Sequence, residues 1–109
     1  MEAPDDVKQA LNTNLDITLK KISAYVAHSN SRKDIYGIQN LEEFVFGMVY
    51  QSFFKKCVDY NVKYVQALNA QTKRQNAIDM SSVSEAIFEN RRDEIRQLIN
   101  AYLEKAKSS

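Results

Sequence analysis

The chain has few of the residues that hold small folds together by covalent or metal cross-links. Its 109 residues include one cysteine, Cys57, and one histidine, His28. A disulfide framework needs pairs of cysteines, and a structural zinc site needs several cysteine or histidine ligands. Both kinds of site are therefore excluded. A single cysteine is typical of a protein in a reducing compartment, so we expect an intracellular protein.

Glycine and proline are also scarce, with 2 and 1 residues. A many-stranded sheet needs such residues at its turns, so an all-β fold is excluded. No apolar run approaches the roughly 18 to 20 residues that span a bilayer. The start, residues 1–6, is acidic and unlike a signal peptide. We therefore expect no membrane association and no export by a classical signal.

The chain also lacks an excess of charge of one sign. Lysine and arginine number 15, aspartate and glutamate 14, and the net charge is +1. This balance argues against a nucleic-acid coat protein or a polybasic membrane binder, so any basic binding surface must be a local patch. The length and the 44% of hydrophobic residues suit one compact domain over residues 1–109.

Apolar residues spaced three and four apart predict an all-α fold of three to four helices. A first helix is predicted over 6–28, because Pro4 and two aspartates suit a helix start. The polar residues 29–34 predict a loop, followed by a short apolar segment with Ile35, Tyr36 and Ile38 that packs down before the next helix. A last helix is predicted over 80–105, capped by Asp79 or Ser81, as one helix or as two interrupted at 89–92. Residues 106–109 are expected to fray.

The longest predicted helix covers residues 40–74, with Asn40 as its N-cap. Apolar side chains cover most of its circumference, and only a narrow polar stripe remains. Such a helix must be covered on several sides. Two shorter helices of the same chain can cover about half of it, so we expect a second chain to cover the rest. Cys57 lies in this apolar surface and is expected to act as a small hydrophobe.

Residues with catalytic or metal-binding chemistry form no pattern that predicts an enzyme. His28 is expected near the end of the first helix, where an imidazolium would favour the negative end of the helix dipole. The acidic residues between 85 and 94 alternate with arginines and predict a salt-bridged surface rather than a metal site. No glycine-rich phosphate loop occurs. We therefore expect no catalytic, cofactor or metal site and no small-molecule substrate.

Residues 73–87 resemble the second loop and third helix of histone-fold proteins. The basic pair Lys73 and Arg74 is followed by Ile78, by Asp79 in the capping role, and by an apolar face of Val83, Ala86 and Ile87. Ser82 replaces the usual acidic residue of that motif, and the chain has no basic tail. The resemblance implies a handshake dimer in a chromatin, transcription or kinetochore assembly, and hence a nuclear protein.

These patterns together predict a non-enzymatic interaction subunit that forms a homo- or heterodimer through its long helix. Its partner anchors are expected at Phe44, Phe46, Tyr50, Phe53 and Tyr64, because aromatic side chains dominate interface energetics. In a handshake dimer, a basic edge of Arg32, Lys33, Lys73 and Arg74 would contact the phosphates of duplex DNA weakly. The alternative is an autonomous helical bundle, an adaptor or homodimer in the cytoplasm, with no nucleic-acid role.

Overall fold

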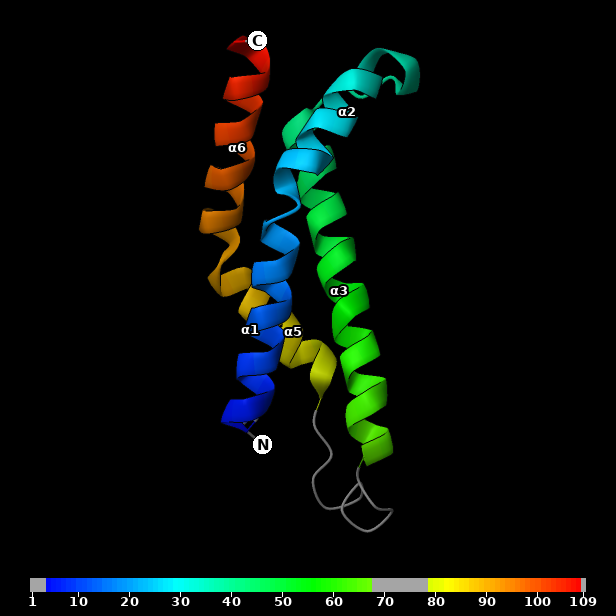
Figure 1. The fold of residues 1–109 in the computed structure, drawn as a ribbon, viewed down its shortest axis with the longest axis vertical. Helices are drawn as coiled ribbons and strands as arrows, with labels where there is room; N and C mark the ends of the chain where they lie inside the picture. The colour runs from blue at the N-terminus through cyan, green and yellow to red at the C-terminus, as the bar shows by residue number, and fades with distance from the viewer. Residues whose placement is uncertain (1–3, 68–78, 109) are drawn as a thin grey trace.

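The computed structural model describes residues 4–67 and 79–108, and all regular structure in them is helical. The described residues form five helices: α1 (Asp5–Leu19), α2 (Ile22–Tyr36), α3 (Leu41–Ala67), α5 (Met80–Asn90) and α6 (Arg92–Ser108). Three arms run up, down and up the long axis of a molecule measuring 56 × 24 × 18 Å (Figure 1). The first arm is α1 and α2, the second is α3, and the third is α5 and α6. The all-α prediction is confirmed, although the described helices outnumber the predicted three to four.

The first arm bends at Lys20 and Lys21, so the prediction of one helix over 6–28 is wrong. The Thr18 hydroxyl donates to the Asn14 carbonyl at 2.9 Å, and Lys21 N–H donates to the Thr18 carbonyl, three residues back, at 3.0 Å. A side-chain bond to a carbonyl one turn back bends helices, and three-residue bonds tighten the turn. The predicted apolar stripe still continues through the bend, with Val7, Leu11, Leu15, Ile22 and Val26 all buried.

The predicted loop over 29–34 is also wrong, because these residues belong to α2. Ser29 is only 1% exposed, and its hydroxyl lies 3.4 Å from Sδ of Met48 on α3. Packing against α3 therefore outweighs the low helix propensity of this polar stretch. His28 consequently lies in the middle of α2, exposed to solvent, and not at a helix end as expected.

Gly37 ends α2 with φ +66°, a conformation that favours glycine. The N–H groups of Gly37 and Ile38 both donate to the carbonyl of Lys33, so one otherwise free carbonyl of the last turn is bonded by the two residues that end the helix. Ile35 and Tyr36 of the last turn are 74% and 62% exposed. The expectation that they pack down is therefore wrong, because the last turn of α2 extends past the core.

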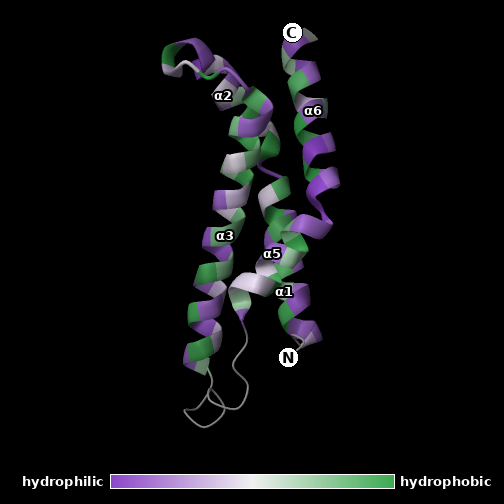
Figure 2. Ribbon diagram, turned by 180° about the vertical axis from the view of Figure 1, so that it is seen from behind, coloured by the Kyte–Doolittle hydropathy of each residue, from purple (hydrophilic) through white to green (hydrophobic). Residues whose placement is uncertain are grey.

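The core lies on one side of α3, and each of the other four described helices contacts α3. Asn40 caps α3 as predicted, since its Oδ1 accepts the N–H of Glu43 at 3.1 Å. Figure 2 shows apolar and polar residues interleaved along the helices, as expected when each helix buries one side. Residues 68–74 of the predicted long helix lie outside the described residues. The buried apolar residues of α3 are Val45, Val49, Phe53 and Cys57.

The third arm consists of two helices that meet at Arg91. Of the two predictions for residues 80–105, one helix or two, the second is therefore correct. Asp79 caps α5 as predicted, because its Oδ1 accepts the N–H of Ser82 at 3.2 Å. α6 continues through the described part of the tail that is expected to fray, as far as Ser108. Ala106 packs against the core, so the apolar face of α6 continues into this last turn. No helix in the described residues combines the length and the apolar character needed to cross a membrane.

Candidate functional site

One side of α3 points away from the core and carries exposed apolar residues. We define the outward face of α3 as Phe44, Gln51, Lys55, Val58, Val62 and Val65, which are all exposed. Val58, Val62 and Val65 are 46%, 49% and 41% exposed, and their spacing of four and three places them in one row. A spacing of four and three is also that of the apolar seams of coiled coils. The first arm and the third arm cover the opposite side of α3.

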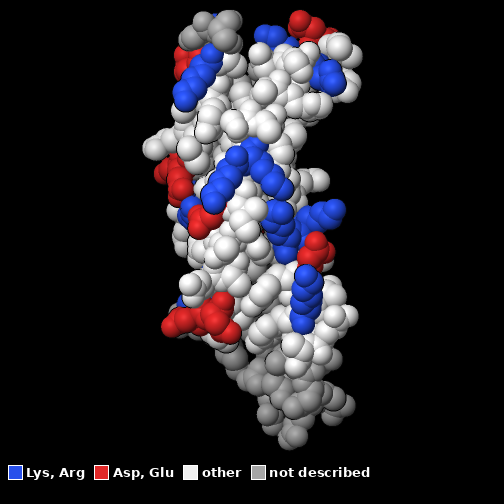
Figure 3. Space-filling model, in the orientation of Figure 1, with Lys and Arg blue, Asp and Glu red and all other residues white. Residues whose placement is uncertain are grey.

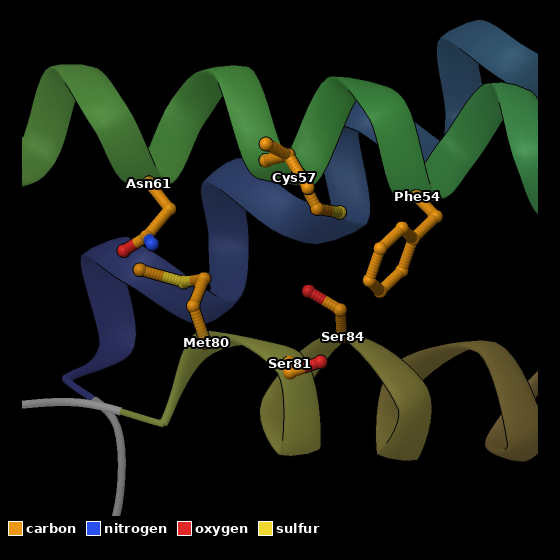
Figure 4. Close-up of a pocket in the computed structure, with 7 residues that line it drawn as sticks. Phe54, Cys57, Asn61, Met80, Ser81 and Ser84 are labelled. Atoms are coloured by element: carbon orange, nitrogen blue, oxygen red, sulfur yellow. The ribbon is translucent and has the colours of Figure 1, made fainter.

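A pocket of about 80 Å³ lies beside this row, between α3 and α5 (Figure 4). Val58 belongs to both the outward face and the pocket wall, so the two features form one continuous surface. Most of the wall is apolar, and three side chains are polar. The residues that line the pocket are Phe54, Cys57, Val58 and Asn61 of α3 and Met80, Ser81 and Ser84 of α5.

Ser84 brings a buried polar atom to this pocket. It is 1% exposed, and apart from a weak interaction with the Cys57 thiol its Oγ has no hydrogen-bond partner among the described residues. In Figure 4 the hydroxyl points from α5 toward α3, into the space between Phe54, Cys57 and Met80. A buried hydroxyl without a partner is costly, so each such group calls for an explanation. A group that enters the pocket and bonds to Ser84 would remove this cost.

Cys57 is buried at the back of the pocket, as expected for a small hydrophobe. Burial raises the pKa of its thiol, and the neighbouring Ser84 hydroxyl lowers that pKa by less. The neutral thiol is therefore the favoured form, whereas nucleophilic or metal-binding cysteines need the thiolate. In the described part of the chain, no three histidine, cysteine or acidic residues are grouped to hold a metal ion.

The predicted aromatic anchors fall into two groups. Phe44 and Tyr50 are 42% and 36% exposed, and both can reach a partner. Phe53 is 1% exposed and stacks on Phe88 at 5.8 Å between ring centres. Phe53 therefore belongs to the core of this chain, and its assignment as a partner anchor is corrected.

The remaining two predicted anchors, Phe46 and Tyr64, are half-buried. The Phe46 ring meets Phe88 edge-on at 5.3 Å, and the Arg96 guanidinium lies 4.0 Å above it. Tyr64 stacks on Tyr60 at 6.2 Å. Phe88 of α5 is thus the hub of the aromatic cluster, because the rings of Phe46, Tyr50 and Phe53 all contact it. Most of the aromatic surface of these side chains is therefore packed within this chain.

The predicted salt-bridged surface on the third arm is confirmed. Arg91 pairs with Glu94 at 2.9 Å and with Asp16 of α1 at 2.7 Å, and Arg92 pairs with Glu89 at 3.3 Å. A further arginine of α6 bridges to the start of α3, where Arg96 contacts Glu42 at 3.1 Å and Glu43 at 2.8 Å. The pairs of Glu94 and Glu89 lie within the third arm, whereas those of Asp16, Glu42 and Glu43 join the third arm to the first and second arms.

The predicted phosphate-binding edge is described only in part. Lys33 is exposed and Arg32 is half-buried, and both lie on α2 rather than in a loop. Lys73 and Arg74 lie outside the described residues. Figure 3 shows basic side chains gathered near the middle of one view, with acidic side chains interspersed along the molecule.

The sequence pattern missed the valine row and the pocket as a site. The spacing of Val58, Val62 and Val65 was available as a signal, but it was hidden within a helix that is apolar on most sides. Nothing in the sequence marks Ser84, which reads as an ordinary serine inside a helix. Its burial beside the pocket follows only from the approach of α5 to α3.

Comparison with known proteins adds no relative: no family model, no curated protein and no solved structure matches the chain. Nothing in these searches indicates the histone-fold superfamily, so that resemblance stays a prediction. The site must therefore be interpreted from its own geometry.

Proposed function

We propose that this chain is a non-enzymatic helical interaction protein that binds a protein partner through the outward face of α3. The observation that carries the proposal is the row of half-exposed valines next to an apolar pocket on the longest described helix. An uncovered apolar row beside a pocket is typical of helix-in-groove recognition. Of the two architectures expected, the arrangement of the five described helices supports the autonomous helical bundle.

The size of the apolar row sets what the interface must contain. Burying one half-exposed valine contributes roughly 1 kcal/mol, so three valines contribute about 3 kcal/mol. Association costs at least about 4 kcal/mol in lost freedom of motion. The valine row is therefore too small by itself, and the partner must also fill the pocket or contact the flanking aromatic side chains.

A position-specific cross-linking experiment tests the proposal. A photo-reactive phenylalanine analogue replaces Val62 in the row or Gln97 on α6, which is exposed on the third arm. Irradiation of cells that express each variant should give a protein adduct at position 62 and none at position 97. The absence of an adduct at 62, or equal adducts at both positions, would overturn the proposal.

The setting of the interaction remains the prediction made from the resemblance. A histone-fold handshake would place the protein in a chromatin, transcription or kinetochore assembly in the nucleus. The described geometry offers no separate observation for that setting or for duplex DNA as a ligand. The proposal concerns the docking surface alone, and its support comes from α3 and α5.

A further inference from the structure

We infer that the partner is a second copy of this chain, and that the two α3 helices cross antiparallel near Val62. In this arrangement the valines of each copy enter the pocket between α3 and α5 of the other copy. The inference rests on the proposed function, because it names the occupant of the same surface.

The size of the pocket selects the side chain that fills it. Its volume of about 80 Å³ is well below the roughly 150 Å³ of an apolar cavity that binds benzene. An aromatic ring is therefore too large, whereas a small branched aliphatic side chain fits. The exposed apolar side chains on this half of α3 are valines, and the exposed aromatic residues Phe44 and Tyr50 lie toward its start. The chain thus carries the side chain that its own pocket accepts.

Repulsion between the two Lys55 side chains favours an antiparallel crossing that is centred away from Lys55, near Val62. In a parallel pairing each residue of the outward face meets its own copy, so Lys55 would face Lys55. An antiparallel crossing at Val62 places each Lys55 about 10 Å from the crossing, on opposite sides. The two ammonium groups are then about 20 Å apart, which exceeds the screening length of about 8 Å at physiological salt. The net charge of +1 per chain adds little long-range repulsion.

The polar atoms of the pocket also fit this arrangement. Asn61 precedes Val62 and lines the pocket, so it lies on the α5 side of the crossing. An antiparallel crossing therefore brings each Asn61 amide next to the pocket of the other copy. The amide can both donate and accept, which suits the Ser84 hydroxyl, whose one neighbour for hydrogen bonding among the described residues is the weakly bonding Cys57 thiol. A polar contact of this kind fixes the register of a helix pair.

Cysteine substitutions on α3 test the register. Val62→Cys places thiols at the crossing, within the 4.4–6.8 Å between Cα atoms that a disulfide needs. Lys55→Cys serves as the matched control, because it lies on the same face two turns away. Under mild oxidation V62C should form an intermolecular disulfide and K55C should not. Disulfides in both variants would indicate a parallel pair, and a disulfide in neither would exclude this crossing; either result overturns the inference.

Sedimentation of the full chain tests whether the partner is a second copy of this chain. A crossing of one helix pair is smaller than a standard interface of about 800 Å² per partner. We therefore expect the chain to dimerise as its total concentration rises from about 1 to 500 µM. The wild-type mass should rise toward twice the 12.6 kDa of one chain. Val62→Glu should abolish the rise, and Gln97→Glu, at an exposed position on α6, should retain it. A wild-type chain that stays monomeric overturns the inference, whereas a position-62 adduct with a different protein would still support the proposed function.

Discussion

Arg91 joins three parts of the fold at one residue. Its side chain donates to Glu94 through Nε at 3.0 Å and through Nη2 at 2.9 Å, and it pairs with Asp16 of α1. The hydrogen bonds with Glu94 raise the pKa of Arg91 and lower the pKa of Glu94. The side chain is 21% exposed, whereas Arg92, which has a single pair with Glu89, is 51% exposed. Arg91 therefore ties the junction of α5 and α6 to α1.

We expect Arg91→Ala to lower the free energy of unfolding by about 1 kcal/mol, because paired but partly solvated charges contribute modestly. The matched variant Arg92→Ala should change it by less than about 0.5 kcal/mol. Urea denaturation near pH 7 measures both. Equal losses in the two variants would contradict the assigned role of Arg91.

The lowered pKa of Glu94 also predicts the pH dependence of stability. A carboxyl whose pKa is lowered by folding adds stability at pH values above its unfolded pKa of about 4.3. This contribution is lost as the pH falls through the lowered pKa in the folded chain. Between pH 6 and pH 3 the wild type should therefore lose more stability than Arg91→Ala. Parallel curves for the two proteins would show that the pair does not form in solution.

At the scale of elements, two glycines have opposite roles. Gly37 ends α2 with φ +66°, whereas Gly47 lies inside α3. A Cβ atom added at either position would meet nothing within 4 Å. Any change in stability on substitution by alanine therefore comes from the backbone.

We expect Gly37→Ala to lower the free energy of unfolding by about 1 kcal/mol, because alanine disfavours the left-handed conformation. Gly47→Ala should raise it by roughly 0.5 to 1 kcal/mol, since alanine is a better helix former. Thermal unfolding followed by circular dichroism shows whether each substitution lowers or raises the stability. A stabilising Gly37→Ala would show that α2 does not end at this residue.

At the scale of the whole molecule, the three arms share one core. The third arm supplies a large part of it through Met80, Ile87, Phe88, Ile95, Ile99 and Leu103. Without these residues the buried sides of α1, α2 and α3 would face water. The hairpin of the first two arms is therefore not expected to fold alone.

A chain that ends after Asp79 should lose cooperative unfolding, because its apolar core is incomplete. A chain that ends after Glu104 keeps Leu103 and should unfold in one transition. Circular dichroism and tyrosine fluorescence should give coincident transitions for the longer chain. A sharp transition in the shorter chain would show that the first two arms form an independent unit.

The sequence by itself determined the helical class, the cap residues and much of the buried stripe. Period-3.6 spacing identified Val7, Leu11, Leu15, Ile22 and Val26, which are all buried. Asn40 and Asp79 were identified as caps because their short polar side chains bond to the nearby backbone. These features depend on neighbours within one or two turns, and such local rules can be read from a sequence.

Only the tertiary structure decided where the helices bend and which side chains face outward. Residues 29–34 became helical because Ser29 packs against Met48, a contact between residues 19 positions apart. Phe53 faces the core and Val62 faces outward because four other helices cover one side of α3. The pocket and its buried Ser84 hydroxyl exist only where α5 meets α3. Such contacts between distant segments set the site, and no local pattern encodes them.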